Sequence, residues 1–209
     1  MTTTRRPGRP KDLVKGDAIL DAGWALFIEH GVEAVSIEAI AARAGVSRQM
    51  IYRNFADKHA LFEQAAARKM LAIETVEIDR PGGREDTLEG ALRTFGIAIM
   101  SYLASDTAVA FYNVLAEELR RRPNIAQRFY EIGPGQMIAD LASILAGAGD
   151  RLVIDDHVKA AEALFGLWQG GSNFAVSLGV DAKVTKQAIV ERVDYGVLLF
   201  MRAFSRLNL

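Results

Sequence analysis

The stretch from residue 36 to residue 55 constrains the fold of this 209-residue chain more than any other part. Its apolar residues recur at helical spacing on both sides of a central glycine, Gly45. A glycine can adopt positive φ where a helix must end, and Ser47 can cap the helix that follows. The stretch therefore predicts two short helices, 37–44 and 48–54, joined by a tight turn.

The second of these helices is expected to have two different faces. Apolar residues, Met50 and Ile51, point toward a core, while the outward positions are polar and basic. The outward residues are Arg48, Gln49, Tyr52 and Arg53. A two-turn helix with such a face fits the major groove of DNA, where arginine pairs with guanine and glutamine with adenine. We therefore expect a helix-turn-helix whose second helix reads bases.

A longer pattern surrounds this motif and makes it more specific. It consists of Leu26, Phe27, Gly31, Val35, Ser36, Ile37, Ile40, Ala41, Ala44, Gly45, Val46, Ser47, Ile51, Tyr52, Phe55, Lys58, Leu61 and Phe62. With this spacing, residues 15–63 resemble the TetR/AcrR family of transcriptional regulators. The resemblance implies an all-α fold of about nine helices, with an N-terminal arm and three-helix helix-turn-helix DNA-binding domain at 1–62. A helical ligand-binding and dimerisation domain would follow at 63–209.

The resemblance also implies roles for individual residues at the DNA. Arg48 and Gln49 would read bases. The contacts to the DNA backbone would come from Ser36, Ser47, Tyr52, Arg53 and Lys58. Two alternatives remain open, because Tyr52 can be a core aromatic residue with a solvated hydroxyl and Arg53 can be a solvated surface charge.

The first ten residues form a basic arm. Arg5, Arg6 and Arg9 alternate with prolines, which keep a chain extended, and arginine favours the negative potential of a narrow minor groove. The alternative is a basic tail that adds only nonspecific affinity for DNA. The net charge of the whole chain is −1, so attraction to DNA must come from such local patches.

The rest of the chain is expected to be helical. Glycines and prolines divide it into amphipathic segments, with a first helix over 15–30, a long helix from about 58 to about 78, and four or five further helices over 85–205. Pro134 lies between two glycines inside a helical pattern and predicts a kink.

Two apolar stripes in the last part of the chain predict a dimer interface. Small and large residues recur there every three or four positions, as in the seam between packed helices. The interface residues would be Ala161, Leu164, Trp168, Gly171, Ala175, Ile189, Val193, Gly196, Phe200 and Ala203. In the resembled family, the last two helices of each subunit form the homodimer. The alternative is that both stripes face the subunit's own core.

An aromatic-rich middle region is a candidate ligand pocket. The lining residues would be Phe95, Ile99, Tyr102, Phe111, Tyr112, Asn113, Phe129, Met137, Trp168, Gln169 and Asn173. Such a stripe is also what an ordinary core looks like, so this prediction concerns the region more than any single residue. The expected guest is a small, mostly apolar molecule.

The remaining sequence features narrow the class of function. There is no cysteine, and the three histidines are scattered, so we expect no metal site, no cofactor and no enzyme activity. No secretory signal and no apolar run of about 18 residues is present, which predicts a cytoplasmic protein with no membrane partner. The expected function is a regulator, by family default a repressor, that binds a pseudo-palindromic operator in double-stranded DNA as a homodimer and leaves it when a small-molecule effector binds. The alternative is a helical protein–protein adaptor that does not bind DNA.

Overall fold

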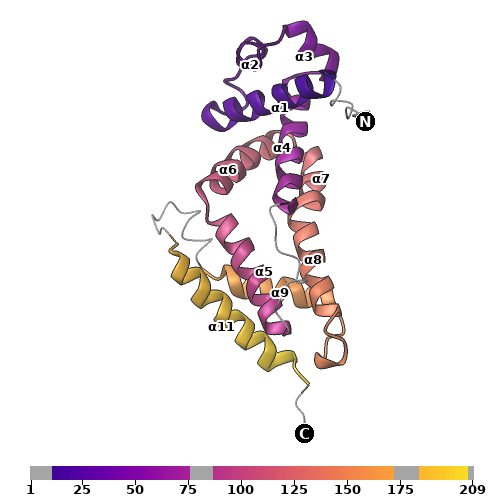
Figure 1. Ribbon diagram of the computed structural model, residues 1–209, viewed down its shortest axis with the longest axis vertical. Helices are drawn as coiled ribbons and strands as arrows, with labels where there is room; N and C mark the ends of the chain where they lie inside the picture. Colours follow the sequence, from indigo (N-terminus) through magenta and orange to yellow (C-terminus); the bar gives the residue numbers. More distant parts are fainter. Residues whose placement is uncertain (1–10, 76–86, 172–183, 207–209) are drawn as a thin grey trace, which may run out of the picture. The chain divides into compact units, whose positions relative to one another are not determined.

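A computed structural model describes residues 11–75, 87–171 and 184–206 of the chain (Figure 1). Within these ranges the regular structure is helical, apart from one isolated antiparallel bridge between Leu152 and Ser205. The predicted all-α fold is confirmed.

The chain divides into two compact units. The first, called the head below, comprises residues 1–72 and 110–124, and the second, called the body, comprises residues 73–109 and 125–209. The predicted division of function at residue 62 remains a prediction. What the units add is that residues 110–124, far along the chain, pack with the N-terminal helices.

The head begins with four helices. They are α1 (Lys11–His30), α2 (Ile37–Ala44), α3 (Arg48–Asn54) and α4 (Lys58–Thr75). The bounds of α2 and α3 match the predicted 37–44 and 48–54, whereas α1 begins four residues before the predicted start at 15. The part of α6 (Asp106–Arg121) from residue 110 onward completes the head.

The head has its own apolar core. Ile19 and Phe27 of α1, Ile40 of α2, and Leu61 and Phe62 of α4 are fully buried. The rings of Phe27 and Phe62 meet edge to face with centroids 5.6 Å apart. Because each helix contributes to this one cluster, the apolar spacing of the sequence fixes which face of each helix turns inward.

The described helices of the body follow from residue 88. They are α5 (Leu88–Leu103), α7 (Ala126–Tyr130), α8 (Gln136–Ala146), α9 (His157–Gln169) and α11 (Lys186–Phe204), with short 3₁₀ turns at Pro123–Ile125 and Gly149–Arg151. Between α7 and α8 the chain makes a π-helical turn over Glu131–Gly135. Pro134 lies inside this turn, at the position where the sequence predicts a kink, because proline cannot donate the backbone hydrogen bond that a regular α-helix needs.

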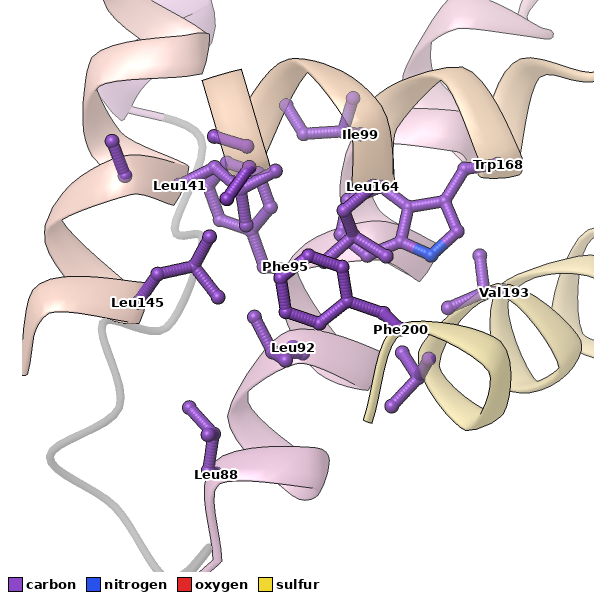
Figure 2. Packing of buried hydrophobic residues seen from close by; sticks show 14 of the residues in the cluster. Leu88, Leu92, Phe95, Ile99, Leu141, Leu145, Leu164, Trp168, Val193 and Phe200 are labelled. Atoms are coloured by element: carbon purple, nitrogen blue, oxygen red, sulfur yellow. The ribbon is translucent and has the colours of Figure 1, made fainter. Parts of the chain in front are cut away.

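Trp168 lies at the centre of the body's core, where α5, α8, α9 and α11 meet (Figure 2). Its side chain is fully buried, and its ring centroid is 6.3 Å from that of Phe95. Leu141 and Leu145 of α8 close the cluster on another side. Burying an indole of this size contributes several times the apolar area of an average core residue.

Two glycines make room for the Trp168 indole. A Cβ at Gly96 of α5 would lie 2.9 Å from Trp168 Cζ2, and a Cβ at Gly196 of α11 would lie 2.7 Å from Trp168 Cδ1. Contacts this short do not occur between real Cβ atoms and ring atoms, so α5 and α11 approach the ring only because both positions lack a side chain.

No described helix is by itself long and apolar enough to cross a membrane, and α5 and α6 pass the length and composition test only when joined across the break between them.

A first prediction concerns the close approach at the indole. Gly196→Ala should lower the free energy of unfolding by about 1–3 kcal/mol, because the added methyl overpacks the core by more than the gain in helix propensity offsets. Urea denaturation followed by tryptophan fluorescence measures this change.

Gly16→Ala is the matched control, since Gly16 is also inside a helix and has nothing within 4 Å of its Cβ position. That variant should gain up to about 1 kcal/mol. A Gly196→Ala protein as stable as Gly16→Ala would contradict the crowding.

Candidate DNA interface

The corner between α2 and α3 is built by two caps and one glycine. Ser36 Oγ accepts a hydrogen bond from the Ala39 amide at the start of α2, and Ser47 Oγ accepts one from the Met50 amide at the start of α3. Gly45 ends α2 with φ 65°, the left-handed conformation that the sequence predicted for it. Both serine hydroxyls keep their own proton and can still donate it to a phosphate oxygen.

α3 has the two faces that its sequence predicts. Ile51 is fully buried and Phe55, which follows the helix, is 5% exposed. The polar face is open, since Arg48, Gln49, Tyr52 and Arg53 are all exposed. Tyr52 is 58% exposed and so is not a core aromatic residue. Its contact with DNA, like that of the other three, remains a prediction.

Arg48 does not project alone from α3. Its Nη1 donates a hydrogen bond of 2.8 Å to Glu38 Oε1, across the corner on α2. The bond to Arg48 lowers the pKa of the Glu38 carboxyl and raises the pKa of the guanidinium, as expected when each charge stabilises the other. Sequence analysis missed this pair because the two residues are ten positions apart and lie on different helices.

Lys58, the predicted backbone contact after α3, is held from the other side. Its Nζ donates to the Glu33 carbonyl at 2.9 Å and lies 3.9 Å from the Glu33 carboxylate. The lysine side chain is 20% exposed. An ammonium has three donors, so these contacts still leave Lys58 able to bind a phosphate.

Next to Lys58, the head contains a buried carboxylate. Glu118 on α6 is 2% exposed, and its Oε1 lies 2.8 Å from His59 Nδ1 in the first turn of α4. Arg122 Nη1 lies 4.0 Å from the same carboxylate and 2.8 Å from Glu63. The rings of Trp24 and Phe111 pack beside each other with centroids 5.2 Å apart and join α1 to α6. These contacts attach the end of α6 to the helices that carry α3.

Glu33, His59 and Glu118 place one possible ligand atom each within 4.8 Å of one another, which raises the question of a metal ion. Arg121 Nη1 lies 3.2 Å from the Glu33 carboxylate, and Arg122 approaches Glu118. These cations already neutralise the carboxylates and would repel a divalent ion. The three residues are therefore better explained as an ionic network than as a metal site. Their wide separation in sequence hid them from sequence analysis.

The predicted minor-groove residues Arg5, Arg6 and Arg9 lie outside the described residues, as do Asn173 of the predicted pocket and Ala175 of the predicted interface.

The other predicted pocket residues are divided between the two units. In the head, Phe111 is buried, Tyr112 is half-buried and Asn113 is exposed, and burial raises the pKa of the Tyr112 phenol. In the body, the buried members are Phe95, Ile99, Phe129 and Trp168, and the half-buried ones are Tyr102, Met137 and Gln169. The prediction that they line a ligand site is carried forward as a proposal below.

Most of the predicted dimer residues are inside the core of the body. The buried ones are Ala161, Leu164, Trp168, Ile189, Val193, Gly196 and Phe200. Gly171 and Ala203 are exposed. The apolar side chains that α9 and α11 do expose are Leu167 (39%), Tyr195 (62%) and Leu198 (46%). Any second copy that meets these two helices would touch this exposed strip first.

The corner, its capping serines and the open polar face of α3 define a helix-turn-helix head on an all-α chain. Residues 19–65 match the family described as "Bacterial regulatory proteins, tetR family". Residues 90–206, more than half of the chain, match "AefR-like transcriptional repressor, C-terminal domain". The chain therefore belongs to the TetR family of transcriptional regulators and is not an enzyme.

Individual relatives agree with this assignment. The structure titled "Flavonoid-responsive Regulator FrrA" is 32% identical, with 93% of this chain and 98% of that chain covered and a TM-score of 0.79. A TetR-family regulator from Mesorhizobium loti is 24% identical, with 95% and 100% covered and a TM-score of 0.83, which shows the shared fold. The uncharacterized regulator YdeS of Bacillus subtilis is 43% identical over 54 residues, a stretch that spans 27% of that protein and 26% of this chain.

Proposed function

We propose that this regulator is a cytoplasmic repressor that binds a pseudo-palindromic operator as a homodimer and is released by a small, mostly apolar molecule. The observation that carries the DNA-binding part is the open face of α3, on which Arg48 and Gln49 are exposed while Ile51 is buried. A helix fixed by its apolar face and open on a basic, amide-bearing face suits insertion into the major groove.

The same geometry supports the division of labour among the other predicted contacts. Ser36 and Ser47 are at the N-termini of α2 and α3, where free amides and hydroxyl protons attract phosphate. Tyr52, Arg53 and Lys58 would hold the DNA backbone beside them, and the arm with Arg5, Arg6 and Arg9 would follow the minor groove. Phosphate contacts set position and affinity, whereas base contacts set sequence preference.

The second prediction separates these two kinds of contact. Arg48→Ala or Gln49→Ala should lose about 1–3 kcal/mol on the operator and leave binding to random DNA nearly unchanged. Lys58→Ala should weaken operator and random DNA alike and reduce the salt slope by about one unit. The operator is first obtained by selection from a random duplex library, and affinities are measured by gel shift at several salt concentrations.

Equal losses on both DNAs for Arg48→Ala would remove its base-reading role. If no duplex is selected above background, the alternative of a helical adaptor becomes the better account.

The homodimer is supported by the exposed strip on α9 and α11. Leu167, Tyr195 and Leu198 are large apolar residues that remain open in a body whose other apolar residues are mostly buried. Tyr195 and Leu198 are three positions apart and share one face of α11. Two copies related by a two-fold axis would bury the same strip on both sides.

The third prediction tests this interface without touching the core. Tyr195→Arg combined with Leu198→Arg should convert the dimer to monomer at micromolar concentration, because four arginines would meet across the two-fold axis. Light scattering measures the mass. Val153→Arg is the control, since Val153 is also exposed (59%) but precedes α9 and lies outside the strip. A double variant that stays dimeric would place the interface elsewhere.

The effector is proposed from the region and from a relative. The predicted pocket residues of the body that retain partial exposure, Tyr102, Met137 and Gln169, combine an aromatic, a thioether and an amide group. Such a mixture suits a mostly apolar guest oriented by a few hydrogen bonds. The relative that is 32% identical is titled a flavonoid-responsive regulator, so flavonoids head the candidates for this chain.

The fourth prediction is that an effector among flavonoids and other aromatic compounds raises the melting temperature in a concentration-dependent way. The same compound should weaken operator binding by about 5–150-fold, and operator DNA must weaken the compound by the same factor. A compound that stabilises the protein but binds free and DNA-bound protein equally would contradict its role as an effector.

A further inference from the structure

Glu38 is an acidic residue placed on the surface that should meet an anionic polymer. It lies in the first turn of α2, two positions after the capping Ser36, and its side chain is 60% exposed. A carboxylate facing DNA costs affinity, because it repels phosphate and competes with it for the helix N-terminus. Its position therefore calls for a compensating role.

The compensating contact is the one to Arg48. Glu38 Oε1 accepts from Nη1 alone, at 2.8 Å. Among the described residues, Arg48 Nη2 and Nε have no hydrogen-bond partner. A guanidinium carries its five N–H groups in a rigid plane, so fixing one nitrogen leaves the Nε and Nη2 edge as a preoriented pair of donors. That pair matches the two acceptors, N7 and O6, that guanine presents in the major groove.

We propose that Glu38 is a positioning residue that holds the Arg48 guanidinium so that its free edge reads guanine. This inference rests on the proposed base-reading role of Arg48. Without Glu38, a long arginine side chain would sample many rotamers and also reach phosphates, which every sequence offers. The carboxylate thus trades general affinity for DNA against preference for one base.

The experiment compares Glu38→Ala with Glu29→Ala on two probes, the duplex selected by the wild-type protein and an unrelated duplex of equal length. Glu29 is a matched control because its side chain is 58% exposed and its carboxylate lies 3.6 Å from an arginine of α2, Arg43, rather than from α3. Both variants remove one negative charge from the head. Any difference between them therefore reports on the contact with Arg48.

Relative to Glu29→Ala, Glu38→Ala should bind the selected duplex about two- to fivefold more weakly, the range expected for an exposed ion pair, and the unrelated duplex no more weakly. In an Arg48→Ala background the difference between the two variants should vanish. Repeating the library selection with Glu38→Ala should relax the guanine preference at the position that Arg48→Ala identifies and leave the other positions unchanged. Glu38→Gln, which can still accept from Nη1, should restore part of that preference.

Two outcomes would overturn the inference. If Glu38→Ala and Glu29→Ala behave alike on both probes, Glu38 has no role beyond its charge. If Glu38→Ala binds the selected duplex more tightly than Glu29→Ala, Glu38 competes with the base for Arg48 instead of positioning it. Failure of the proposed function is a separate result, because the wild-type protein would then select no duplex at all.

Discussion

The burial of Ile40 and Ile51 on either side of Gly45 is the constraint on which the candidate DNA interface depends. Both side chains are fully buried, one on α2 and one on α3. Since a helix of two turns has only two faces, burying Ile51 leaves the opposite face of α3 no choice but solvent. The left-handed turn at Gly45 then sets the direction in which that face points. The exposure of Arg48 and Gln49 thus follows from the packing of residues that never meet DNA.

Charged side chains adjust what the apolar core has placed. Glu38 contacts Arg48 of α3, and Glu33 contacts Lys58 at the start of α4, so two of the predicted DNA contacts are each restrained by an acidic residue of the same head. His59 and Glu118 connect that region to α6. Because exposed ion pairs are individually weak, such contacts tune orientation more than they stabilise the fold.

The sequence was sufficient for the parts of this protein that local patterns determine. Helix periodicity, a serine before each short helix and one glycine located α2 and α3 to the residue, since capping and turn chemistry act over three or four positions. The contacts of Arg48, Lys58 and His59 were not predictable in the same way. Their partners are 10, 25 and 59 positions away, and charged residues on a surface carry no periodic signal that would pair them.

The apolar stripes of α9 and α11 illustrate a different limit. A seam spacing says that one side of a helix is covered, but it cannot say whether the cover is the same chain or a second copy. In this protein the stripe through Leu164 and Trp168 is covered by α5, α8 and α11 of its own body, and Gly196 is small because the indole lies against it. The surface left for a partner is the adjacent face with Tyr195 and Leu198, whose exposure only the packed core reveals. A dimer built there would join the two bodies through residues that a pattern-based search passes over, since three exposed apolar side chains are too few to form a stripe in sequence.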